Sequence, residues 1–200
     1  MLDARLRRLT AAPLARAGRA LDRTGVRAGW VTAAGWLLGA GACVAAGAAA
    51  WWAALALWLA NRLLDGLDGA VARASTPTAR GAFVDLVADF SVYGGFVVGV
   101  AVAEPPARLA CAVLLLAYYA SGAAFLSLSS LLERQGRAGG DERSLRFIGG
   151  LAEGTETIVA YVLFCLLPAD AAVIAWVFAA AVGVTALQRV WVGARLLSAP

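Results

Sequence analysis

Long apolar stretches alternate with short polar turns along almost the whole chain. Each stretch is about 20 residues long, which is the length of helix that crosses a hydrocarbon core about 30 Å thick. Because backbone groups in lipid must bond within their own helix, the pattern predicts an all-α, polytopic membrane protein. We expect six transmembrane helices, at residues 29–49, 51–73, 80–102, 107–131, 148–168 and 170–192.

The first 27 residues follow a different pattern, with seven arginines between regularly spaced leucines. They lack the long apolar core of a cleavable signal peptide. Leu6, Leu9 and Leu14 lie at roughly helical spacing, which predicts an amphipathic helix on an anionic membrane surface, although a solvated basic arm is an alternative. We therefore treat residues 1–200 as one membrane domain, with a juxtamembrane helix at 1–27 and a six-helix bundle at 28–198.

Charge indicates the orientation of this bundle. The chain is 62% hydrophobic and only 15% charged, which does not suit a soluble protein, and every basic residue is an arginine. Seven arginines precede the first span, Arg73 and Arg80 stand at the turn between spans two and three, four lie between spans four and five, and Arg195 follows the last span. The opposite side has only Arg108. The positive-inside rule therefore puts both termini in the cytoplasm. An even number of spans also requires both termini to lie on the same side, so the two arguments agree.

Histidine is absent, which excludes histidine-based catalysis and His-ligated zinc. Cys43, Cys111 and Cys165 lie inside predicted spans and share no spacing motif. We expect these cysteines to pack as small apolar side chains rather than to form disulfides or bind metal.

Four aspartates interrupt the second and third predicted spans. Asp65 and Asp68 are three residues apart, and Asp85 and Asp89 are four apart, so each pair projects from one helix face. The short turn at 75–81 makes the two helices antiparallel neighbours. The sequence therefore predicts that four carboxylates meet between them, near the cytoplasmic surface.

Four bare carboxylates at this depth would repel one another and would be costly to desolvate. Oxygen-only ligands favour Mg²⁺, Mn²⁺ or Ca²⁺ over zinc, and four carboxylates suit a pair of metals with shared ligands. The alternatives are buried ion pairs or helix caps, a divalent-cation or proton-coupled transporter, and a catalytically silent scaffold. Against a transporter, no ladder of ionisable residues continues to the far side along these two spans.

The stretch from Asp65 to Asp89 resembles the signature of the CDP-alcohol phosphotransferase family. It reads Asp65-x-x-Asp68-Gly69-x-x-Ala72-Arg73, then seven residues, then Gly81-x-x-x-Asp85-x-x-x-Asp89. The six spans and the basic N-terminal helix also resemble that family's architecture. The resemblance implies transfer of a phosphatidyl-type group from a CDP-alcohol, commonly CDP-diacylglycerol, to an acceptor hydroxyl. The reaction releases CMP and belongs to phospholipid biosynthesis.

The resemblance also implies a role for each signature residue. Asp65, Asp68 and Asp85 would ligate two Mg²⁺ or Mn²⁺ ions, and Asp89 would ligate one metal and take the acceptor's proton. The nucleotide-binding residues would be Asp68, Gly69, Ala72, Arg73 and Gly81. Members of the family commonly form homodimers.

The start of the first span departs from the family pattern. Family members often carry a Pro-Asn-x-x-Thr-like sequence there, whereas this chain has Ala28 and Gly29, with Thr32 retained. A nucleotide or substrate contact made by that asparagine in other family members therefore cannot be assigned to this chain.

The fifth predicted span opens with an acidic pair, Glu153 and Glu156. Family members with phosphorylated acceptors tend to be basic in this region. A carboxylate pair would bind hydroxyls or an amine and repel a phosphate, so we hypothesise a polyol or amino-alcohol acceptor. Alternatively, the pair only holds spans together through nearby arginines, or the loop arginines bind a phosphate. The candidate acceptor-binding residues are Glu153, Glu156, Arg146 and Arg189.

Overall fold

The computed structural model describes residues 13–18, 20, 28–74, 78–135 and 154–198. Within these residues the chain is helical, without a strand, which confirms the all-α prediction. The elements are α2 (Ala28–Gly47), α3 (Trp51–Ala74), α4 (Ala79–Ala103), η1 (Pro105–Ala107), α5 (Arg108–Arg134), α7 (Gly154–Leu166), η3 (Pro168–Asp170) and α8 (Ala171–Ser198).

Each predicted span overlaps one helix of the described residues: α2, α3, α4, α5, α7 and α8 in chain order. Four segments are long and apolar enough to cross a membrane: Gly29–Gly47, Ala79–Ala103, Pro105–Arg134 and Pro168–Ser198. Helix α3 has 24 residues but carries four charged side chains, and the described part of α7 has 13 residues. The count of six spans therefore stays a prediction. Large apolar side chains such as Trp52 and Leu187 are exposed on the outside, as lipid-facing residues are.

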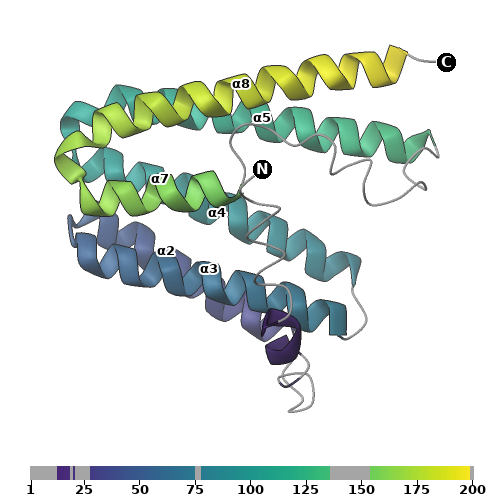
Figure 1. Cartoon of the computed structure of the whole chain (residues 1–200), viewed down its shortest axis with the longest axis horizontal. Coiled ribbons are helices and arrows are strands. Elements are labelled where there is room, and N and C mark those ends of the chain that lie inside the picture. The colour runs from purple at the N-terminus through teal and green to yellow at the C-terminus, as the bar shows by residue number, and fades with distance from the viewer. Residues whose placement is uncertain (1–12, 19, 21–27, 75–77, 136–153, 199–200) are drawn as a thin grey trace.

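The helices form two groups, which are joined by α7 and by direct packing of α4 against α5. Helix α2 packs against α3 and α4, α5 packs against α8, and α7 contacts both α3 and α8 (Figure 1). A fully buried aromatic cluster connects α3, α4 and α7. The Tyr161 ring lies 4.7 Å from both the Trp58 ring and the Phe96 ring, measured between centroids. These contacts fix α3 and α4, the two helices that carry the aspartates.

The first turn of α4 is set by a side-chain cap. Thr78 has an extended backbone, and its hydroxyl accepts a hydrogen bond of 3.1 Å from the Gly81 amide. Such a cap satisfies a backbone donor that has no partner within the helix. Helix α4 therefore starts at Ala79, which places Asp85 in its second turn.

A short N-terminal helical segment packs on α3. Residues 13–18 are helical, and a Cβ atom added to Gly66 would lie 3.3 Å from the Leu14 side chain. The glycine therefore gives Leu14 room against α3. The rest of the predicted surface helix lies outside the described residues, and its placement on a membrane surface stays a prediction.

Helices α2 and α4 approach closely at Gly99. A Cβ atom there would lie 2.6 Å from the Cys43 carbonyl oxygen and 3.1 Å from the Ala46 Cβ. Small residues at such crossings let two membrane helices pack through their backbones. This close approach brings α2 alongside the α3–α4 pair.

We predict that Gly99→Ala lowers the thermal unfolding midpoint in detergent, because one methyl group would force α2 and α4 apart at a typical cost of about 1–3 kcal/mol. The matched control is Gly183→Ala on α8, where an added Cβ meets nothing within 4 Å. The control should leave the midpoint unchanged or raise it. Equal midpoints for the two variants, measured by size-exclusion after heating, would contradict this packing.

Candidate active site

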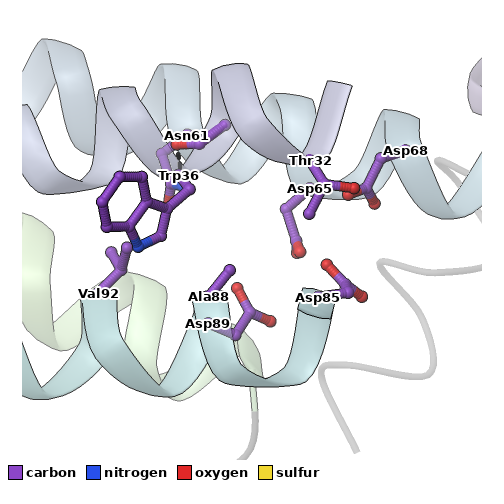
Figure 2. A pocket seen from close by; sticks show the side chains of 10 residues that line it. Thr32, Trp36, Asn61, Asp65, Asp68, Asp85, Ala88, Asp89 and Val92 are labelled. Atoms are coloured by element: carbon purple, nitrogen blue, oxygen red, sulfur yellow. Dashed lines mark hydrogen bonds between the residues drawn. The ribbon is translucent and has the colours of Figure 1, made fainter. Parts of the chain in front are cut away.

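The two aspartate pairs face one another between α3 and α4, as the sequence predicts. Figure 2 shows Asp65 and Asp68 on one helix opposite Asp85 and Asp89 on the other. One carboxylate oxygen from each of Asp65, Asp68 and Asp85 lies within 4.8 Å of the other two. Three carboxylates at this separation can hold a divalent cation through oxygen ligands alone.

Helix α2 forms a third wall of the site. A small pocket is lined by Thr32, Gly35, Trp36, Asn61, Asp65, Asp68, Asp85, Ala88, Asp89 and Val92. Thr32 forms a hydrogen bond with the Asp68 carboxylate, which is 5% exposed. The Asn61 amide donates 2.8 Å to the Gly35 carbonyl oxygen, a contact drawn in Figure 2. The α2 wall thus orients one of the three converging carboxylates.

Sequence reasoning missed the α2 wall apart from Thr32. Trp36 donates from Nε1 to the Ser91 hydroxyl at 2.9 Å and so connects α2 to α4. A tryptophan in an apolar span is indistinguishable in sequence from a lipid-facing one, so only the packing of α2 could identify Trp36. Asn61 carried a weak sequence signal, because it is an amide beside the charged residues of its span. The structure shows that its side chain is buried.

Asp89 and Asp65 share one arginine partner, Arg62. Oδ1 of Asp89 accepts a hydrogen bond of 2.9 Å from Nη2 of Arg62. Nη1 of the same arginine lies 3.5 Å from Oδ2 of Asp65. Among the described acids, Asp89 is not part of the group that lies within 4.8 Å. Its contribution to a metal site therefore stays a prediction.

The other signature residues lie on the same two helices. Gly81 lies in the first turn of α4, where an added Cβ would be 3.1 Å from the Thr78 hydroxyl oxygen. Gly69 lies within α3, one residue after Asp68. The backbones of Ala72 and Arg73 belong to the last turn of α3, but their side chains lie outside the described residues. The nucleotide-binding role of these positions stays a prediction.

Of the four predicted acceptor residues, the structure describes Glu156 and Arg189. Glu153 and Arg146 lie outside the described residues. Glu156 lies in the first turn of α7 and lines an apolar groove of about 400 Å³ with residues of α7 and α8, such as Val159 and Val177. Within the described part of the chain, the lining of the aspartate pocket does not include it. Glu156 therefore stays a predicted acceptor residue without a described contact to the aspartates.

Arg189 lies on α8 and connects it to α5. Its Nη1 donates to the Ser121 hydroxyl at 2.8 Å and approaches the Ser121 carbonyl oxygen at 3.3 Å. Its guanidinium carbon also lies 5.3 Å from the centre of the Phe125 ring. These contacts stabilise the α5–α8 pair, and the role of Arg189 in acceptor binding stays a prediction.

Comparison with known proteins identifies relatives of this architecture. The family model described as CDP-alcohol phosphatidyltransferase matches residues 24–187. The inner membrane protein YnjF of Escherichia coli (strain K12) is 41% identical over 138 residues, which cover 68% of this chain and 67% of that protein.

The fold is also similar to solved structures of the phosphatidylinositol phosphate synthase PgsA1 of Mycobacterium tuberculosis. The structure with CDP-DAG bound superposes with a TM-score of 0.71 at 21% identity, covering 90% of this chain and 92% of that one. The complex with manganese and citrate gives a TM-score of 0.68 at 22% identity, covering 90% and 88%. At these identities the likeness establishes the shared fold.

The family match and the aspartate geometry agree. The matched region includes every signature position from Asp65 to Asp89. The apolar helices and the inner-membrane relative indicate an integral membrane protein. The chain therefore belongs to the CDP-alcohol phosphatidyltransferase family, and it is an integral membrane transferase.

Proposed function

We propose that the protein transfers a phosphatidyl-type group from a CDP-alcohol lipid, CDP-diacylglycerol, to an acceptor alcohol and releases CMP, in phospholipid biosynthesis. The convergence of Asp65, Asp68 and Asp85 within 4.8 Å, with Asp89 beside them, is the observation that carries this proposal. The CDP-DAG bound to the similar fold of PgsA1 supports the choice of donor.

The chemistry of the donor set fits a hard divalent metal. The described pocket lining offers carboxylate, amide and hydroxyl oxygens and no thiol. We propose that Asp65, Asp68 and Asp85 hold two Mg²⁺ or Mn²⁺ ions, and the family resemblance adds a contact from Asp89. When bound, such ions offset the charge that develops on the transferred phosphate and on the departing nucleotide. The manganese in a PgsA1 structure supports this assignment.

The chain's own residues perform the proton transfer and the positioning. Asp89 accepts the proton of the acceptor hydroxyl. At the same time, the hydroxyl oxygen of the acceptor forms a bond to the β-phosphorus of the donor. The bond between that phosphorus and the bridging oxygen breaks, and CMP leaves with the electron pair. Gly69, Ala72 and Gly81 leave space for the cytidine nucleotide, and the Arg73 fork can bind a phosphate oxygen.

The distribution of arginines supports a site on the cytoplasmic side, with both termini there as well. This location suits a donor whose acyl chains lie in lipid and whose nucleotide lies in water. A homodimer is the assembly that family resemblance favours. The acidic pair Glu153 and Glu156 supports an acceptor without a phosphate, such as a polyol or an amino alcohol.

We predict that the purified protein releases CMP from CDP-diacylglycerol only with Mg²⁺ or Mn²⁺ and that a chelator stops the reaction. Asp89→Asn should lower CMP release about 10²–10⁴-fold, because an amide cannot accept the proton. Asp170→Asn, in η3 at the other end of the helices, is the matched control and should leave the rate unchanged. No CMP release from any CDP-alcohol, together with aspartate-dependent Mn²⁺ uptake into vesicles, would instead favour a transporter.

The acceptor is tested by competition among alcohols. We predict turnover with an unphosphorylated polyol or amino alcohol, because Glu153 and Glu156 would repel a phosphate group. Glu156→Gln should then raise KM for that acceptor more than KM for the donor. Turnover with glycerol 3-phosphate or inositol phosphate alone, measured by lipid chromatography, would exclude the preference.

The orientation predicts the behaviour of fusion reporters. A fluorescent protein fused after Pro200 should fluoresce in cells, and alkaline phosphatase fused there should be inactive, because the C-terminus is cytoplasmic. A phosphatase fused in the turn at Pro105 is the matched control and should be active. The reverse pattern would place the aspartate site on the outer side.

A further inference from the structure

Trp36 on α2 is the residue at which the aspartate pocket meets the lipid-facing surface. Among the described residues that line the pocket, it alone has an exposed side chain, at 43%, whereas the others are buried or partly buried. Figure 2 shows its indole beside Val92, at the opposite end of the pocket from Asp68 and Asp85. Because α2 is one of the apolar helices long enough to cross a membrane, the indole borders both the pocket and the hydrocarbon.

Beyond Trp36, toward the end of α2, the two helices α2 and α4 are in close contact. A Cβ atom added to Gly39 would lie 2.5 Å from Cγ2 of Val92. The Cys43 thiol donates to the Val92 carbonyl oxygen at 3.4 Å. Contacts at this distance leave no room for a ligand between the two helices. The pocket therefore ends at Trp36 along the boundary between α2 and α4.

The indole of Trp36 is held in place from α4. Its Nε1 donates to the Ser91 hydroxyl at 2.9 Å, and that hydroxyl donates to the Ala88 carbonyl oxygen at 2.7 Å. Tryptophan suits such a boundary because it presents a large apolar ring while its single N–H group is satisfied. The ring is thus fixed at the edge of the pocket, next to a helix turn that itself lines the pocket.

The order of groups along the pocket matches the order of parts in a CDP-alcohol lipid. The proposed nucleotide positions Gly69 and Gly81 lie nearest to the turn between α3 and α4, and the three converging aspartates come next. Thr32 of α2 contacts Asp68, and Trp36 lies one turn further along α2, about 6 Å on the helical rise. A donor with its nucleotide at the turn and its pyrophosphate at the aspartates therefore presents its lipid part to Trp36.

We propose that Trp36 selects the donor. Its indole packs against the glyceride portion next to the transferred phosphate, so the site binds CDP-alcohols whose alcohol is a lipid better than soluble ones. The proposal rests on the proposed transferase function and assigns the class of donor to a residue outside the eight signature positions. Because lipid tails are as apolar as the ring, the selection comes from close packing of the two surfaces.

A purely structural Trp36 would act through its hydrogen bond to Ser91. In that case Trp36→Phe, which keeps a ring but lacks the N–H donor, would be as harmful as Trp36→Ala. Ser91→Ala, which removes the acceptor, would be equally harmful. Contact with the donor predicts instead that loss of the ring has the larger effect. The conservative variant therefore separates the two roles.

The first test measures equilibrium binding to the full-length protein in detergent with Mn²⁺, using CDP-dioleoylglycerol and CDP as the two probes. We expect Trp36→Ala to raise Kd for the lipid about fivefold or more, because loss of the ring removes many small dispersion contacts. Kd for CDP should change less than about twofold, because CDP lacks the glyceride. Trp36→Phe and Ser91→Ala should both stay within about twofold of wild type for the lipid.

The matched control is Trp176→Ala on α8. This side chain is 46% exposed, and it is not among the residues that line the aspartate pocket or the α7–α8 groove. The control should change neither Kd. Equal losses for the lipid and for CDP in Trp36→Ala would overturn the proposal, and so would a loss as large in Ser91→Ala.

The wild-type protein separates this proposal from the transferase function. If it binds CDP-dioleoylglycerol no better than CDP, donor selection by Trp36 is overturned, while CMP release from a soluble CDP-alcohol would leave the transferase function standing. Binding needs no turnover. Lipid-selective binding that depends on Trp36, without CMP release from any CDP-alcohol, would contradict the transferase function alone.

A second measurement covers the case in which Trp36→Ala does not fold. CDP-diacylglycerol with a diazirine near the start of its acyl chains is photolysed with the wild-type protein, and the labelled residues are mapped by mass spectrometry. We expect label on α2 at Trp36 or at Leu37, which is 64% exposed, and its loss under excess unlabelled donor. Competable label that spares α2 and lies elsewhere, for example at Val159 or Val177 of the α7–α8 groove, would overturn the proposal.

Discussion

Carboxylates gathered within a membrane protein repel one another and are costly to remove from water, and this constraint governs the architecture around the site. Three of the aspartates converge within 4.8 Å, a distance at which a divalent cation can join them. The fourth, Asp89, shares with Asp65 an arginine that is almost fully buried. The cluster therefore contains one fixed positive charge, on Arg62, and a set of carboxylate oxygens that suit divalent cations.

The rest of the bundle keeps this charge arrangement in place. Gly99 lets α2 and α4 approach until an added methyl group would clash, and this approach turns α2 into a wall of the pocket. The Thr78 cap sets where α4 starts and hence the height of Asp85 relative to Asp65. The aromatic cluster around Tyr161 supports Tyr93 and Trp58, which in turn support Arg62. Packing far from the chemistry thus determines the geometry of the acids.

The two groups of helices serve different purposes. Helices α2, α3 and α4 build the aspartate pocket, whereas α5 and α8 pack along each other and are joined through Arg189 and Ser121 (Figure 1). Helix α7 lies between the groups and contributes both the buried Tyr161 and the partly exposed Glu156. Because α7 contacts both α3 and α8, it helps to fix the position of one group relative to the other.

Local features of the sequence were enough to predict the helices and the aspartate cluster. Span length follows from bilayer thickness, and the spacings of Asp65 to Asp68 and of Asp85 to Asp89 follow from helix periodicity, so both can be read from neighbouring residues. The signature also identified the family before any fold was known. The contacts of Arg62 could not be predicted, because its partners Tyr93 and Asp89 lie on another helix and its ring contacts depend on how the helices pack. Sequence thus determined which groups are present and on which helix face they lie. Only the tertiary structure decided which acids converge and that the arginine reaches Asp89 across to α4, because those distances depend on contacts between helices.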